Sequence, residues 1–165
     1  MELLSLCYIF KGLSASQFQR LSEITKEKPI QKGEVLMSEG QKAEALFIIK
    51  EGEVELLTSV NDSFELPIAI LRNQGDCAGI SSLVVPYKYS LSARCVKAAQ
   101  ILIIKQTALE KLMQEDHKLG CIMMKNLAHV IAKPLRPGAA GRIQNYQVFL
   151  FKGHTHAPLR DFRPR

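Results

Sequence analysis

The hydrophobic positions follow three successive patterns along the chain. Apolar side chains recur at helical spacing in residues 1–25, form short runs separated by turn sequences in residues 29–105, and return to helical spacing in residues 107–133. The turns recur every few residues and no helical stretch separates the runs, which is typical of an antiparallel roll or sandwich and not of alternating βαβ units. The pattern therefore predicts a mainly-β domain with flanking helices.

The ends of the helices are visible in the sequence. Ser14 followed by Gln17 matches a capping box, in which each side chain satisfies a backbone N–H of the first turn. Pro134 is expected to end or kink the last helix. The expected helices span Glu2–Phe10, 14–25, Thr107–Glu115 and His117–Lys133.

The central runs are each expected to form a separate strand. They lie at Ile30, Val35–Met37, Leu46–Ile49, Val54–Leu57, Pro67–Leu71, Ser90–Ala98 and Gln100–Lys105. Glycines interrupt them at positions where a turn needs positive φ, which are Gly33, Gly40, Gly52 and Gly75. The segment around Gly52 is accordingly predicted to be a turn between two strands.

Charge divides the chain into two parts. The net charge is +6, but residues 134–165 hold six basic side chains and one acidic one. The rest of the chain is almost neutral, so the basicity belongs to the tail. We expect one domain at 1–135 and a basic, poorly ordered tail at 136–165. The tail lacks a pair of amphipathic helices, which argues against sequence-specific DNA binding.

The four cysteines form no C-x-x-C pair. This favours reduced thiols in a cytoplasmic protein over a disulfide framework or a zinc site. The apolar N-terminus is too short to span a bilayer, and we expect no membrane anchor. A metal site at His154 and His156 is not expected, because no acidic or sulfur ligand lies nearby in the sequence.

Candidate chemistry concentrates between Gly75 and Arg94. Glycines come first, and Ile80–Leu83 then has the composition of a short helical turn. Open backbone N–H groups and a helix N-terminus favour an anion, although no obvious charge completes such a site. Ser81 and Ser82 lack the surroundings of a nucleophile elbow, so no catalytic residue and no enzymatic activity are predicted.

Several short motifs in this order resemble the cyclic nucleotide-binding domain family. The motifs are Phe10–Ser14, Lys32–Glu34, Phe47–Val54, Gly75–Gly79 and Ser90–Cys95. The resemblance covers roughly residues 8–135. It implies an eight-stranded double-stranded β-helix, or jelly roll, between leading and trailing helices. It also implies a regulatory role, with cyclic AMP or cyclic GMP as the ligand class and no other cofactor.

The resemblance assigns the family's phosphate-binding cassette to named positions. Gly79 corresponds to its glycine and Ile80 to its glutamate. Ser81 and Ser82 correspond to the two residues whose backbone N–H groups face the phosphate. Tyr89 corresponds to its arginine, and Ser90 to the hydroxyl residue that follows. Both charged anchors are thus replaced. Shifting the loop by one residue would bring Lys88 to the arginine position. However, adjacent strand residues point to opposite faces, so Lys88 and Tyr89 cannot both enter the pocket, and a solvated Lys88 is favoured.

These features predict a stand-alone regulatory module whose binding of cyclic AMP or cyclic GMP is weakened or lost. Two alternatives remain: a protein-interaction module without a small ligand, and a pocket retuned for another small anionic or apolar effector. The end of the last helix, around Ala128–Leu135, is the expected moving lid and homodimer seam.

Overall fold

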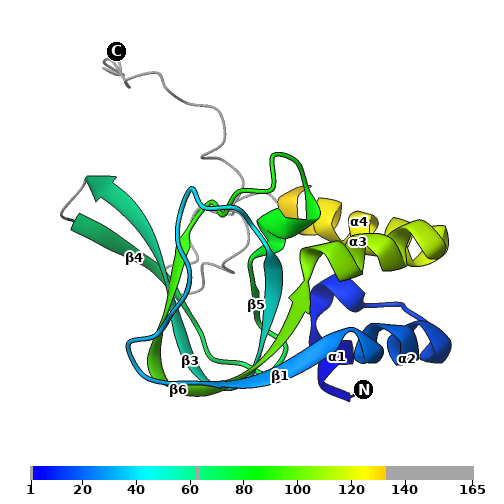
Figure 1. Cartoon of the computed structure of the whole chain (residues 1–165), viewed down its shortest axis with the longest axis horizontal. Helices are drawn as coiled ribbons and strands as arrows, with labels where there is room; N and C mark the ends of the chain where they lie inside the picture. The colour runs from blue at the N-terminus through cyan, green and yellow to red at the C-terminus, as the bar shows by residue number, and fades with distance from the viewer. Residues whose placement is uncertain (1, 62–63, 133–165) are drawn as a thin grey trace, which may run out of the picture.

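The computed structural model describes residues 2–61 and 64–132. The described strands form one antiparallel sheet that curls into a roll, and the α-helices gather beside one end of it (Figure 1). The strands are β1 (Thr25–Ile30), β2 (Val35–Met37), β3 (Ala45–Asn61), β4 (Phe64–Leu71), β5 (Cys77–Ala78) and β6 (Ser92–Lys105). Their order is β1-β6-β3-β4, with β2 also paired to β6 and β5 to β3. The predicted mainly-β class is confirmed.

Two of the predicted breaks between strands are absent. β3 continues through Gly52, and β6 continues through Ala98 and Ala99. Gly52 has φ +94° and lies where the β3–β6 register shifts, and a Cβ there would stand 2.5 Å from the carbonyl oxygen of Ala98. The glycine therefore permits a bulge and a close approach of two strands, not a chain reversal. The described residues consequently form six strands, where the resemblance implied eight.

Helices precede and follow the strands along the chain. They are α1 (Glu2–Leu6), the 3-10 helix η1 (Tyr8–Phe10), α2 (Ala15–Glu23), α3 (Gln106–Glu115) and α4 (His117–Ala132), with a short 3-10 helix, η2 (Ile80–Leu83), between β5 and β6. The capping box is confirmed: Ser14 Oγ accepts from Gln17 N–H at 3.3 Å, and Gln17 Oε1 accepts from Ser14 N–H at 2.9 Å. Pro134 and the tail at 136–165 lie outside the described residues.

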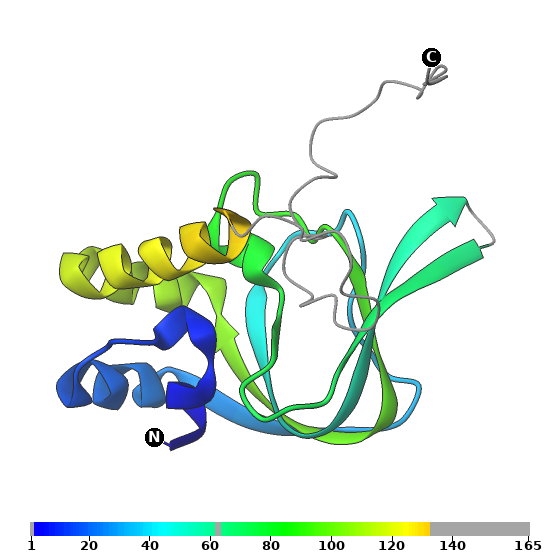
Figure 2. The same cartoon turned by 180° about the vertical axis from the view of Figure 1, so that it is seen from behind.

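The N-terminal segment around η1 holds the last helix, α4, in place (Figure 2). Asn126 Nδ2 donates to the carbonyls of Ile9 at 3.0 Å and Lys11 at 2.8 Å. The rings of Tyr8 and His129 stack with centroids 5.8 Å apart. These contacts connect the end of α4 to η1, so α4 is fixed by polar as well as apolar contacts.

A single core joins the helices to the sheet. Its largest fully buried side chains come from both, and they include Ile9, Phe10, Leu21, Leu46, Ile48, Ile49, Leu56, Leu71, Leu91, Ile101, Ile104 and Leu109. Burial of each such side chain stabilises the fold by about 1.5–3 kcal/mol relative to exposure. The helical end and the roll are therefore parts of one packed unit.

Candidate functional site

The cassette segment begins on β5, which pairs with the first half of β3. Phe47 lies opposite Ala78, and Ile48 opposite Cys77. Just before β5, Asp76 caps the turn: one carboxylate oxygen accepts from the N–H groups of Arg72 at 3.0 Å and Asn73 at 2.9 Å. The acid of the Gly-Asp pair thus stabilises a turn, because that oxygen accepts from the backbone of the residues just before it.

Gly79 follows β5 in the left-handed conformation, with φ +79°. A Cβ at this position would lie 2.6 Å from the carbonyl oxygen of Ala45 and 3.3 Å from Cε1 of Tyr89. Only glycine fits there without displacement of backbone atoms. The tight packing also shows that the ring of Tyr89 lies directly against the cassette glycine.

Tyr89 is buried and fully engaged inside the protein. Its side chain is 6% exposed and packs against Phe47, with ring centroids 6.4 Å apart. Its hydroxyl accepts from the N–H groups of Glu44 at 3.2 Å and Ala45 at 3.1 Å, and it lies 3.2 Å from the Ala45 carbonyl, to which it donates. Burial raises the pKa of the Tyr89 hydroxyl above its ordinary value of 10.0. The position assigned to the family's arginine therefore holds a neutral side chain that braces the start of β3.

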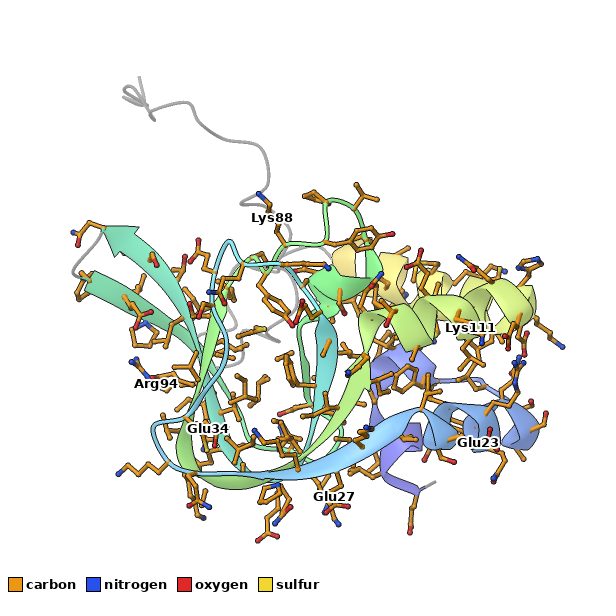
Figure 3. The ribbon with its side chains drawn as sticks, in the orientation of Figure 1. Glu23, Glu27, Glu34, Lys88, Arg94 and Lys111 are labelled. Carbon is orange, nitrogen blue, oxygen red and sulfur yellow. The ribbon has the colours of Figure 1, made fainter. Side chains whose placement is uncertain are left out.

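Ile80 and Lys88 have opposite surroundings. Ile80 is 2% exposed and belongs to the apolar core. Lys88 is exposed, and its backbone forms an isolated antiparallel bridge with Lys42. In Figure 3 the Lys88 side chain extends from the loop away from the sheet. Of the two neighbouring candidates, the structure buries Tyr89 and exposes Lys88, as expected for adjacent residues of an extended segment.

The three cassette serines differ in their hydrogen bonding. The hydroxyls of Ser81 and Ser90 lie 3.2 Å apart and bond to each other. The Ser82 N–H, expected to face a phosphate, donates to the Gly79 carbonyl at 2.9 Å within η2. The Ser82 hydroxyl is buried and has no partner among the described residues. One expected donor is thus used internally, and one polar atom is left unsatisfied.

A hollow beside η2 was missed by the sequence reasoning. It has a volume of about 280 Å³ and lies between η2, the loop that follows it and α3. Ser82, Leu83 and Tyr87 supply one wall, and Leu109, Glu110 and Met113 supply another. These two groups are more than twenty residues apart in the chain, so no local pattern announces the pocket.

Two further findings concern the described residues alone. They contain no group of three or more His, Cys, Asp or Glu side chains arranged to hold a metal ion. Residues His154 and His156 lie outside this part of the chain. None of the described helices has the length and apolar character needed to cross a membrane.

Comparison with known proteins identifies relatives of this segment. Residues 27–116 match the family profile described as cyclic nucleotide-binding domain. The chain is 25% identical over 113 residues to the anaerobic regulatory protein of Bacillus subtilis, a match covering 68% of this chain and 48% of the relative. It is 30% identical over 128 residues to the potassium channel AKT2 of Oryza sativa, covering 75% of this chain and 14% of the channel. The chain therefore spans half or less of the length of these two relatives.

Solved structures show the same architecture. A putative cyclic nucleotide-binding protein from Geobacter metallireducens is 30% identical, with a TM-score of 0.67, and the match covers 78% of this chain and 92% of that one. The similarity therefore spans most of both molecules. The double-stranded β-helix expected from the sequence is confirmed.

Proposed function

The chain belongs to the cyclic nucleotide-binding domain family, and from this premise we propose that it is a regulatory module whose affinity for cyclic AMP and cyclic GMP is weakened or lost. The proposal concerns the cassette residues Gly79, Ile80, Ser81, Ser82 and Tyr89. The glycine and the hydroxyl groups of a cassette are present, whereas both charged anchors are absent.

The observation that carries the proposal is the packing and hydrogen bonding of the Tyr89 side chain. Its ring lies against Gly79, and its hydroxyl is satisfied by the backbone of Glu44 and Ala45. A cyclic phosphate entering this position would have to displace a buried aromatic ring and break those hydrogen bonds. Ile80 adds a buried hydrocarbon where a sugar hydroxyl would need a polar partner. Both features disfavour nucleotide binding, because the free energy needed to displace these groups adds to the loss of the two charged contacts.

The loss of attraction can be bounded. A hydrogen bond to a charged group contributes about 1.5–3 kcal/mol. The absence of two such contacts therefore weakens binding by about two to four orders of magnitude. Helix η2 does not compensate, because it has only four residues and its Ser82 N–H is already bonded.

Isothermal titration calorimetry with cyclic AMP and cyclic GMP tests the proposal. The wild-type chain is expected to show no binding at micromolar concentrations. The double variant Ile80→Glu/Tyr89→Arg is expected to gain binding, because it restores both anchors and removes the ring from Gly79. Micromolar affinity of the wild-type chain would overturn the proposal.

A matched control tests whether the position of the new arginine matters. Ile80→Glu/Lys88→Arg introduces the same residue types but leaves Tyr89 in place, and the exposed Lys88 position should not restore binding. Circular dichroism must show that each variant is folded, since two of the substituted side chains are buried. Equal gains in both double variants would contradict the assignment of Tyr89 to the arginine position.

Protein interaction without a small ligand is the second candidate function. The β3–β4 hairpin extends from the roll in both ribbon views, and four of its large apolar side chains are exposed: Val60, Phe64, Leu66 and Ile70. Clustered exposed apolar side chains are typical of protein contact surfaces. A folded Ile80→Glu/Tyr89→Arg variant that still binds no nucleotide would favour this candidate over a degenerate nucleotide site.

Several broader properties are part of the same proposal. We propose no enzymatic activity, a cytoplasmic location, and no sequence-specific DNA binding by this chain alone. A homodimer seam is proposed around 128–135, of which 133–135 lie outside the described residues. In this seam Ala128 is exposed, while the neighbouring His129 stacks on Tyr8 of the same chain. Sedimentation equilibrium showing only monomer at high concentration would exclude the dimer.

A further inference from the structure

The outer edge of β4 has no partner strand among the described residues. β4 lies at the end of the strand order β1-β6-β3-β4 and pairs with β3 alone. One side of its backbone therefore faces away from every described strand. In both ribbon views the β3–β4 hairpin stands out from the roll, and the helices gather at the other end of the molecule (Figure 1, Figure 2). The edge is thus accessible to a further strand.

Apolar side chains line this edge. Phe64 is 53% exposed, Leu66 44% and Ile70 36%. Edge strands of native proteins are usually protected by lysines, by prolines or by a segment that covers them. β4 has one proline, Pro67, no lysine, and Glu65 as its only charged residue. An apolar edge of this length is typical of a strand to which another strand is added.

The surroundings of the edge are acidic. From residue 53 to the end of β4, the described residues carry three acidic side chains, Glu53, Glu55 and Glu65, and no basic one. The guanidinium of Arg94 on β6 lies 3.9 Å from the Glu55 carboxylate and 3.3 Å from that of Glu65 (Figure 3). Even with Lys97, which lies opposite Glu53 in the β3–β6 register, the negative charges outnumber the positive ones. A segment that covers this edge should therefore be apolar and flanked by basic residues.

The chain itself contains one run with this chemistry beyond the described residues. Tyr146–Phe151 reads Tyr-Gln-Val-Phe-Leu-Phe, a composition rich in aromatic and β-branched residues that favours strands. Arg142 precedes this run and Lys152 follows it directly. No other stretch of 133–165 has six residues of comparable apolar content. The sequence thus supplies an occupant that matches the edge in both hydrophobicity and charge.

The linker is long enough for this segment to reach β4. Thirteen residues, 133–145, separate the end of α4 at Ala132 from Tyr146. Fully extended they span up to about 45 Å, whereas a compact domain of this size is roughly 35 Å across. We propose that Tyr146–Phe151 adds to the outer edge of β4 as a further strand, which covers the exposed apolar side chains of β4 and brings Arg142 and Lys152 to the acidic hairpin.

This inference rests on the protein-interaction candidate, because it assigns an occupant to the same hairpin, and it is independent of nucleotide binding at the cassette. Attachment to the same chain gives the segment an effective concentration in the millimolar range, so a weak contact is sufficient to keep it bound. A partner protein that pairs with β4 has to displace it. The segment therefore regulates access to the hairpin.

Amide hydrogen exchange of the full chain at pH 7, followed by two-dimensional NMR, tests the proposal. Phe149→Asp places a charge in the middle of the segment, and the β4 amides that face away from β3 should then exchange about tenfold faster than in the wild type. Phe162→Asp is the matched control, because it makes the same substitution in the tail outside the segment, and it should leave these rates unchanged. Neither phenylalanine belongs to the described core, so the domain should stay folded in both variants.

A peptide and a charge reversal complete the test. A synthetic peptide of residues 142–153, added at millimolar concentration to the Phe149→Asp chain, should restore slow exchange, whereas a peptide of the same composition in scrambled order should not. After correction for intrinsic rates, Glu65→Lys should speed exchange at β4 about twofold to fivefold. Glu23→Lys, which reverses an exposed charge on α2 (Figure 3), should have no effect.

Three outcomes would overturn the proposal. They are fast exchange of the outward-facing β4 amides in the wild type, equal effects of Phe149→Asp and Phe162→Asp, and protection that increases with protein concentration. The last outcome would assign the edge to a second copy of the chain. No nucleotide is present in these measurements, so their failure is separate from a failure of the cassette proposal. A β4 edge that exchanges fast in the wild type removes the tail as its occupant and leaves the hairpin accessible to a partner.

Discussion

Replacement of Tyr89 by phenylalanine tests whether this side chain braces the cassette. Tyr89→Phe keeps the ring against Phe47 and Gly79 but removes the hydroxyl. Three hydrogen-bond contacts are lost, at 3.1–3.2 Å, to the backbone of Glu44 and Ala45. Glu44 is exposed and water can replace its partner, whereas Ala45 is buried and its groups lose theirs.

The expected cost follows from the buried groups. Leaving a buried donor or acceptor without a partner costs about 1–3 kcal/mol. For a domain of this size, each kcal/mol lowers Tm by a few degrees, so the variant should melt roughly 3–10 °C below the wild type. The ring still fills the site, so Tyr89→Phe should not gain nucleotide binding.

The same residue predicts a change in alkaline stability. The pKa of Tyr89 is raised by burial, so the folded state favours the protonated hydroxyl. The stability that this hydroxyl contributes is fully present below pH 10, and it is lost as the pH rises from 10 toward the pKa of Tyr89 in the folded state. Burial also raises the pKa of Cys95, which adds its own alkaline dependence in both proteins. The difference in stability between wild type and Tyr89→Phe should therefore shrink above pH 10.

Thermal and urea unfolding followed by circular dichroism at pH 7 and at pH 10–11 measure these effects. Tyr87→Phe is the control, because the described residues provide no hydrogen bond to the Tyr87 hydroxyl, and it should melt close to the wild type. If Tyr89→Phe is as stable as Tyr87→Phe, or if its stability deficit is the same at both pH values, the bracing role of the Tyr89 hydroxyl is refuted.

Two other predictions concern the turn glycine and the helix junction. Gly79→Ala should destabilise the fold by about 1–2 kcal/mol more than Gly33→Ala. Both glycines have positive φ, but of the two only Gly79 has a neighbour, the Ala45 carbonyl, that an added Cβ would clash with. Equal losses of Tm in the two variants would contradict this. The Asp116 carboxylate accepts from Leu119 N–H at 2.9 Å and from Gln17 Nε2 at 3.0 Å, and these bonds hold its pKa below the ordinary 3.8. The stability that the Asp116 carboxylate contributes is present above pH 4 and is lost as the pH falls further. Asp116→Asn should therefore melt a few degrees lower than the wild type at pH 7, and the two Tm values should converge near pH 2. Tm values that stay a constant distance apart across this range would rule the effect out.

The sequence by itself determined the local features of this protein. The Ser14–Gln17 capping box, the positive φ of Gly33, Gly40 and Gly75, and the short helical turn after Gly79 all appear where the pattern placed them. Each depends on residues within a few positions of one another, because capping and turn conformation are set by neighbouring backbone groups. The class of fold followed from the spacing of these signals.

Only the tertiary structure decided features that depend on distant partners. Gly52 resembled a turn glycine, but the approach of Ala98 and Ala99 makes it a bulge inside one long strand. The sequence predicted that the side chains of Lys88 and Tyr89 point in opposite directions. The hydrogen bonds between Tyr89 and the backbone of Glu44 and Ala45 determine that Tyr89 is the one that points into the protein. Burial and hydrogen bonding between residues more than forty positions apart have no local signature.

The same reason explains why the sequence could suggest a cassette but could not describe how its residues are packed. The assignment of Gly79 to Ser90 to a cassette rests on residue types and stays a prediction. The burial of Tyr89, the unpartnered Ser82 hydroxyl and the hollow beside α3 arise only when β3, η2 and α3 come together. A residue's type indicates what it can bind, and the packing around it determines which of those groups are already satisfied.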